Sequence, residues 1–163
     1  REDFYTNYRA YDGNFMRFAK VTDLYIAGHF YAEDSPFIFT REDAKSSDFK
    51  IQVVADISCD IDGPVASTIR PSTIAEPMYG YHAATESEVE FDQKDAITVM
   101  AVDNLPCEFP TVASEGFGRD MVTKIIPQLF NGDEGDILKR ATICENGKLA
   151  PKYAFLQDFV DGK

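Results

Sequence analysis

The chain has 163 residues, enough for one domain, and 44% of them are apolar, so it can fill a hydrophobic core. It carries 28 acidic residues against 16 basic ones, which gives a formal charge of −12. This balance argues against a nucleic-acid-binding protein and against binding to anionic lipid, because both ligands reward clustered Lys and Arg.

The first 48 residues predict short helices and one strand. Residues 3–20 space aromatic side chains irregularly in a polar background, which predicts a loop followed by a short helix. Residues 24–30, LYIAGHF, are a short apolar run of β-forming residues and predict a strand. Residues 40–48 predict a short helix, because Thr40 is a suitable N-cap and acidic residues follow it in the first turn.

Two further apolar runs, residues 50–58 and 96–104, predict strands. Like residues 24–30, they are nearly continuous rather than alternating. This pattern favours a parallel α/β sheet whose strands are covered on both faces. The stretch between them, residues 63–95, has no strong periodicity and predicts a long loop, and loops of that length tend to be functional.

The last third of the chain predicts helices and a hairpin. Apolar residues recur every four positions over residues 117–129, which predicts a longer helix that ends at Asn131-Gly132. Residues 135–141 predict another short helix. Residues 142–156 hold an Asn-Gly pair between two apolar runs, which is typical of a β-hairpin.

A polar break follows each of the three predicted strands. The breaks are residues 28–30, 58–60 and 103–106. Open α/β sheets bind their ligands just beyond the carboxyl ends of the strands. The sequence therefore predicts a binding site where these three breaks meet.

Three aspartates, Asp56, Asp60 and Asp62, crowd the second break. A calcium loop is rejected, because Ile69 occupies the position where a bidentate Glu is needed and the segment follows a strand. Asp62 is interpreted as a solvated turn residue, and Asp56, inside the apolar run, as a hydrogen-bonded structural carboxylate. Asp60 stands at the exit of the strand, so it can be functional or simply part of the turn.

The histidines and cysteines give no catalytic pattern of their own. His29 and His82 have no partner at catalytic or metal-ligating spacing, and Cys59 is interpreted as a small buried residue rather than a nucleophile. Three widely spaced cysteines without a Cys/His cluster predict reduced thiols, a cytoplasmic location and no structural metal. No apolar run approaches the roughly 20 residues that span a bilayer, so no membrane segment is expected.

Two stretches of the chain carry a family resemblance. DISCDIDGPVASTIRPSTIAEPMYGY and MAVDNLPCEFPTVASEGFG resemble the superfamily of alanine dehydrogenase, transhydrogenase and saccharopine dehydrogenase. They agree best with its saccharopine dehydrogenase and lysine-ketoglutarate reductase branch, whose motifs D-I-S-A-D, T-T-I-x-x-P-x-x-x-Y and S-I-D-N-x-P match residues 56–60, 72–81 and 101–106. The similarity covers roughly residues 20–130.

The resemblance implies NAD(P)-linked oxidoreduction at the carbon–nitrogen bond of an amino acid, on a Rossmann-like parallel sheet. Asp60 corresponds to a catalytic carboxylate. The positions implied to contact the amino acid substrate are Ser58, Cys59 and Asp60. The positions implied to lie against the cofactor, NAD or NADP, are Ile57, Val102, Asp103, Asn104 and Leu105.

The family's Gly-rich turn and its other catalytic residues have no counterpart in this sequence. The resemblance therefore implies a C-terminal fragment that is inactive without a missing N-terminal domain. Residues 20–110 would form the distal half of a Rossmann-like NAD(P)-binding domain, and residues 111–163 a helical return segment with a hairpin. Truncation could also expose apolar surface and favour a homodimer.

Two alternatives stay open at this stage. One is a non-catalytic α/β module that regulates or senses a nucleotide or an amino acid. The other is an alanine dehydrogenase or transhydrogenase-like subunit, whose motifs agree less well because Asp103-Asn104 and residues 113–118 follow the saccharopine dehydrogenase pattern.

Overall fold

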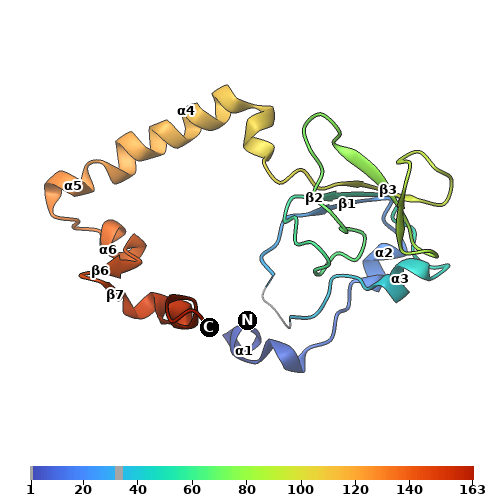
Figure 1. Cartoon of the computed structure of the whole chain (residues 1–163), viewed down its shortest axis with the longest axis horizontal. Helices are drawn as coiled ribbons and strands as arrows, with labels where there is room; N and C mark the ends of the chain where they lie inside the picture. The colour runs from blue at the N-terminus through green and yellow to red at the C-terminus, as the bar shows by residue number, and fades with distance from the viewer. Residues whose placement is uncertain (1, 32–34) are drawn as a thin grey trace. The chain divides into compact units, whose positions relative to one another are not determined.

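The computed structural model describes residues 2–31 and 35–163 (Figure 1). The chain divides into two compact units, residues 1–108 and residues 109–163. All three strand ends that the sequence associates with a binding site belong to the first unit. The assignment of residues 20–110 and 111–163 to separate functions stays a prediction.

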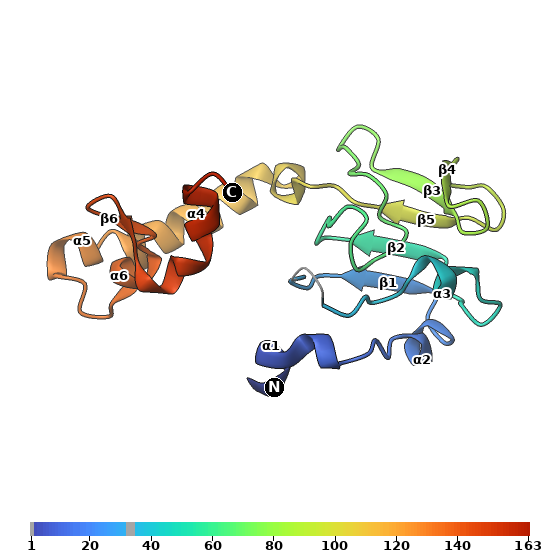
Figure 2. The same ribbon diagram turned by 60° about the horizontal axis from the view of Figure 1, so that its bottom comes forward.

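A five-stranded sheet in the order β1-β2-β5-β3-β4 forms the framework of the first unit (Figure 2). Strands β1 (Leu24–Ala27), β2 (Val53–Asp56) and β5 (Ile97–Met100) run parallel to one another. Strand β3 (Met78–His82) is antiparallel to β5, and β4 (Ser87–Val89) is antiparallel to β3. The predicted α/β class and the parallel centre are confirmed, although each predicted strand is shorter than its apolar run.

The prediction of a long loop over residues 63–95 is wrong, because β3 and β4 lie within it. Gly80 is in the middle of β3, and a Cβ atom at this position would lie only 2.4 Å from the carbonyl oxygen of Glu90. The absence of a side chain at Gly80 therefore permits the close approach of the backbone at Glu90. Glycine also weakens the strand pattern in the sequence, so the pattern does not predict this hairpin.

Short helices precede and follow the first strand of the sheet. The structure contains α1 (Glu2–Asn7), η1 (Tyr8–Ala10), α2 (Met16–Ala19) and α3 (Arg41–Lys45). Helix α1 replaces part of the loop predicted at the start of the chain. The predicted cap of α3 is confirmed: the amide of Asp43 donates to the Thr40 hydroxyl (3.1 Å), and the amide of Thr40 donates to the Asp43 carboxylate (2.9 Å).

Within the first unit, only one face of the sheet is covered by the described residues, in contrast to the expectation from the continuous apolar runs. Val54 and Val99 are fully buried on the face that packs against α2 and α3. On the opposite face, Leu24 is 53% exposed and Ile26 is 58% exposed. The second face therefore keeps the apolar character of a covered sheet without a covering element in the first unit.

The second unit confirms the predicted succession of helices and hairpin. Its elements are α4 (Pro110–Asp120), the π-helical turn η3 (Met121–Ile125), α5 (Gln128–Asn131), α6 (Ile137–Ala141), β6 (Cys144–Glu145), β7 (Lys148–Leu149), η4 (Pro151–Leu156) and α7 (Gln157–Val160). Gly132 ends α5 in the left-handed conformation (φ 78°), and Asn146-Gly147 form the hairpin turn with φ of 52° and 76°. None of residues 109–163 is buried, so no element of the second unit fully covers the predicted apolar stripe over residues 117–129. Within the described part of the chain, no helix is long and apolar enough to cross a membrane.

Candidate functional site

The three parallel strands end at the same edge of the sheet. Ala27 pairs with Asp56, and Ala55 pairs with Met100, so the residues that follow β1, β2 and β5 leave the sheet side by side. We call this the carboxyl edge, formed by residues 28–30, 57–60 and 101–105. It brings together all of the site residues that the sequence analysis selected.

Asp56 anchors the turn that follows β2. Its side chain is 1% exposed, which matches its interpretation as a buried structural carboxylate. Oδ1 accepts hydrogen bonds from the amides of Ser58 (3.0 Å) and Cys59 (3.2 Å), and Oδ2 accepts one from the Thr68 hydroxyl (2.6 Å). Both oxygens are thus engaged, so a buried charge is compensated by three donors. These bonds hold Cys59 in the left-handed conformation, with φ 53°.

Asp60 follows in the same turn and has a different environment. Its side chain is half-buried, and among the described residues no group donates a hydrogen bond to its carboxylate or forms an ion pair with it. Its carbonyl oxygen accepts a hydrogen bond from the Gly63 amide (3.0 Å), and a Cβ atom at Gly63 would lie 2.8 Å from the Asp60 Cβ. The tight turn fixes the backbone of Asp60 while its carboxylate remains available.

Asp62 behaves as the sequence analysis expected of a solvated turn residue. It adopts φ 52°, which Asp tolerates better than most residues, and its carboxylate pairs with the exposed Arg41 guanidinium at 2.9 Å. The two neighbouring aspartates therefore differ in what occupies their oxygens. Asp62 has a partner, whereas Asp60 has none in the described structure.

Ser58 ties the end of β1 to the end of β2. Its hydroxyl donates to the carbonyl oxygen of His29 (2.9 Å), accepts from the amide of His29 (3.0 Å) and lies 3.3 Å from its Nδ1. No sequence pattern predicts Ser58 as a partner of His29, because the two residues are 29 positions apart and meet only through strand pairing. His82 lies at the opposite edge, since β3 runs antiparallel to β5.

The environment of Cys59 is strongly acidic. Burial, and to a smaller extent the carboxylates of Asp56, Asp103 and Asp60, together raise the pKa of the Cys59 thiol to about 11. Cys59 is therefore a neutral thiol near neutral pH, which agrees with its interpretation as a residue other than a nucleophile, although it is half-buried rather than buried. Because Asp60 and Asp103 act on the same thiol, the turns after β2 and β5 share one negative field.

The pKa of Cys59 leads to a labelling prediction. We expect iodoacetamide near neutral pH to alkylate the exposed Cys107 and Cys144 while Cys59 stays largely unmodified, because the thiolate is the reactive form and only about one Cys59 in ten thousand is ionised at pH 7. The rate at Cys59 should rise as the pH approaches about 11. Mass spectrometry of digested protein measures this, with urea-unfolded protein as the control. Equal rates at all three thiols in the folded protein would contradict the assigned environment.

The residues implied to contact the cofactor divide into two groups. Asp103 and Asn104 are exposed, and Leu105 opens the short helix η2 (Leu105–Glu108). Ile57 is half-exposed, and its amide donates to the carbonyl oxygen of Ala27 (2.8 Å). Val102, by contrast, is 3% exposed, and its amide donates to the sulfur of Met100 (3.4 Å), so it offers almost no surface to a ligand.

Two buried hydroxyl residues near the carboxyl edge were missed as functional candidates. Thr68 is bonded to Asp56, and Ser72 is bonded to Ala101 at the end of β5. Both belong to the stretch STIRPST, residues 67–73, which lies within the stretch that carries the family resemblance. The signal that could have found them is that small hydroxyl residues flank a Pro between two strand ends.

The fold and the carboxyl edge define an open α/β domain with a half-buried carboxylate, unpaired among the described residues, where three strands end, which is where such domains bind ligands. Comparison with known proteins gives the class more narrowly. The chain is 26% identical to mouse mitochondrial alpha-aminoadipic semialdehyde synthase over 171 residues, which cover 89% of this chain and 18% of the relative. It is 33% identical to the Arabidopsis thaliana alpha-aminoadipic semialdehyde synthase over 107 residues, with 63% of the chain and 10% of the relative covered.

A third relative is saccharopine dehydrogenase [NAD(+), L-lysine-forming] of Candida albicans, 25% identical over 120 residues that cover 74% of this chain and 30% of the relative. No protein-family model matches the chain. The chain is thus a homologue of alpha-aminoadipic semialdehyde synthases and saccharopine dehydrogenases, which confirms the resemblance inferred from its motifs. It spans less than a third of the length of each of these relatives.

Proposed function

We propose that this chain forms the part of an NAD(P)-dependent amino acid oxidoreductase of saccharopine dehydrogenase type that holds the reacting nitrogen beside the nicotinamide. The observation that carries the proposal is the half-buried Asp60 carboxylate, which has no partner among the described residues and lies in the same negative field as Asp103. Its relatives include a saccharopine dehydrogenase whose name specifies NAD(+). The proposed ligands are an amino acid substrate and NAD or NADP.

The carboxyl edge suits the nicotinamide end of a dinucleotide better than its phosphates. None of residues 28–30, 57–60 or 101–105 is Lys or Arg, so the edge offers no cation for a pyrophosphate. It offers exposed polar groups at Asp103 and Asn104 for the neutral amide of the ring. In the proposed protein, a domain outside residues 1–163 would supply the phosphate site and the remaining catalytic groups.

The chemistry follows from the charge that develops during the reaction. The bound nicotinamide supplies the acceptor or donor of a hydride. When the hydride leaves the carbon that bears the nitrogen, the nitrogen lone pair forms a C=N⁺ bond, and water then hydrolyses this iminium. A fixed carboxylate at Asp60 stabilises the positive nitrogen through a charge-assisted hydrogen bond, and it does so without reorganising. Ser58 and the thiol of Cys59 would complete the contact with the substrate.

Substrate-panel kinetics on the natural full-length protein test this function. We expect turnover with saccharopine, or with lysine plus 2-oxoglutarate, and with NAD(H) or NADP(H), followed through the absorbance of the reduced nicotinamide. The 163-residue chain alone should show no turnover with the same panel. Turnover only with alanine, or with pyruvate plus ammonia, would favour an alanine dehydrogenase. Binding of a nucleotide without any turnover by the full-length protein would refute the enzymatic proposal and favour a sensing module.

A further inference from the structure

Residues 67–73, which we call the bridging segment, connect the turn after β2 with the turn after β5. At one end of the segment, the Thr68 hydroxyl donates to Oδ2 of Asp56 at 2.6 Å. The other oxygen of Asp56 holds the amides of Ser58 and Cys59. Thr68 therefore fixes the carboxylate around which the proposed substrate turn is folded, without reaching the proposed ligand itself.

Ser72 makes the corresponding contact with the other turn. It is 2% exposed, its amide donates to the carbonyl oxygen of Ala101 (2.8 Å), and the amide of Ala101 donates to its hydroxyl oxygen (2.9 Å). The same hydroxyl donates to the carbonyl oxygen of Pro77 (2.9 Å), which leaves it a single orientation. Ser72 also forms a parallel bridge with Val102, the residue directly before Asp103. The position of the proposed cofactor turn is thus tied to Ser72.

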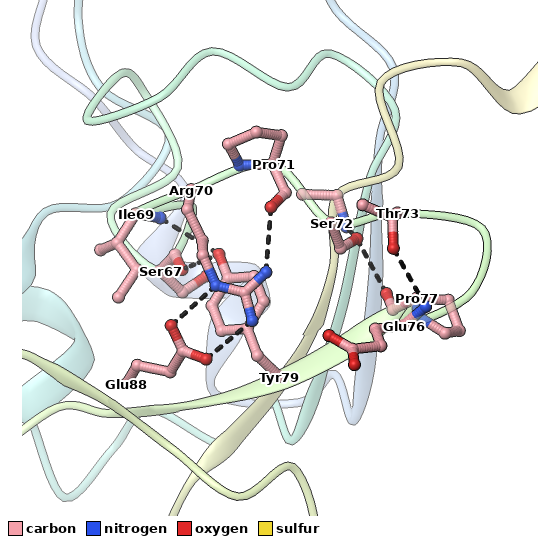
Figure 3. Close-up of polar contacts among 11 residues, drawn as sticks. Ser67, Ile69, Arg70, Pro71, Ser72, Thr73, Glu76, Pro77, Tyr79 and Glu88 are labelled. Atoms are coloured by element: carbon pink, nitrogen blue, oxygen red, sulfur yellow. Dashed lines mark hydrogen bonds and ion pairs between the residues drawn. The ribbon is translucent and has the colours of Figure 1, made fainter.

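The part of the bridging segment between these two anchors is clamped from β3 and β4 (Figure 3). The Tyr79 hydroxyl donates to the carbonyl oxygen of Ser67 (3.0 Å) and accepts from the amide of Ile69 (3.1 Å). The guanidinium of Arg70 lies over the Tyr79 ring, 4.5 Å from its centroid, and donates to both carboxylate oxygens of Glu88 at 2.7 Å. A segment held at so many points behaves as a spacer of fixed length.

We propose that the bridging segment sets the separation between the amino acid and the nicotinamide, with Thr68 and Ser72 as its two positioning residues. Thr68 acts on the substrate turn through Asp56, and Ser72 acts on the cofactor turn through Ala101. The inference rests on the proposed function, because it assigns those two turns to two ligands. Its physical reason is that each turn must present its contacts with its ligand at a fixed place, so a displacement of one turn weakens the binding of the ligand assigned to that turn.

The variants Thr68→Val and Ser72→Ala test the proposal in the natural full-length protein. Each removes one hydroxyl without adding bulk, and a lost hydrogen bond of this kind corresponds to about a tenfold change. We expect Thr68→Val to raise the KM for the amino acid about tenfold and to leave the KM for the dinucleotide within about twofold. Ser72→Ala should raise the KM for the dinucleotide about tenfold and leave the KM for the amino acid within about twofold. It should also weaken dinucleotide binding, measured by nucleotide fluorescence, about tenfold.

A change in only one of the two KM values distinguishes a positioning role from a general contribution to the stability of the fold. Thr68→Ser keeps the hydroxyl and should restore the KM for the amino acid. If Thr68→Val or Ser72→Ala does not fold, Asp56→Asn and Ser72→Cys are measured in their place, since each keeps a polar atom at the same position. The same selectivity should then appear as a change of about threefold in one KM. Equal changes of both KM values, or no change in either, would overturn the proposal. A wild-type protein without turnover would refute the proposed function instead, and the positioning roles with it.

Discussion

Replacing Asp60 by Asn is expected to lower kcat by about a hundredfold or more, with little change in stability. The exchange keeps the shape of the side chain and removes its negative charge. Removing one preorganised electrostatic group from a reacting centre typically costs a factor of about a hundred to a thousand. Because the Asp60 carboxylate has no hydrogen-bond or ion-pair partner among the described residues, its loss should leave the fold intact.

Asp62→Asn is the matched control for this experiment, because it makes the same chemical change two residues away. The Asp62 carboxylate pairs with Arg41 at the surface, and exposed pairs of this kind contribute little to stability. We expect wild-type kcat from this variant. Steady-state rates of the full-length protein, measured with each variant at saturating nucleotide, give the two kcat values to compare. An Asp60→Asn enzyme with wild-type kcat would show that the carboxylate does not act on the reaction.

The second large effect is on stability. We expect Asp56→Ala to lower the free energy of unfolding by about 3 kcal/mol, because it leaves the Thr68 hydroxyl and the amides of Ser58 and Cys59 without their acceptor in a buried site. The turn that carries Asp60 should loosen at the same time. Asp56 thus links the stability of the sheet edge to the geometry of the proposed site.

Urea denaturation of the 163-residue chain, followed by circular dichroism, measures this loss. Asp62→Ala is the control, since it removes an exposed carboxylate in the neighbouring turn and should change the free energy of unfolding by less than about 0.5 kcal/mol. Equal stabilities for the two variants would show that the hydrogen bonds of Asp56 are replaced by water in solution, against the burial seen here.

Local sequence patterns predict the correct elements wherever the structure depends on neighbours in the chain. The capping box at Thr40 and the Asn146-Gly147 hairpin are examples, because each is decided within a few residues. The three parallel strands were also predictable, since their apolar runs are short and bounded by polar breaks. Strand β3 was not predictable, because its Gly80 accommodates the close approach of the Glu90 backbone, and no local pattern reveals this contact.

The candidate site divides in the same way. The exits of the parallel strands could be placed from the sequence, and Asp60 with them, because the topology of an open sheet determines where strand ends meet. The contact between Ser58 and His29 joins residues 29 positions apart, and so does the contact between Ser72 and Ala101. Such contacts depend on strand order, which single-sequence patterns do not specify. The exposed sheet face at Leu24 and Ile26 shows that a continuous apolar run predicts an apolar face but does not predict which element covers it.

A structure of the full-length protein in a ternary complex with nucleotide and amino acid tests the role of Asp60 most directly. We expect one Asp60 carboxylate oxygen within about 2.7–3.2 Å of the substrate nitrogen, with the nicotinamide beside the residues that follow β5. A complex in which both ligands bind elsewhere, and in which Asp60 faces only water, would contradict the proposed function.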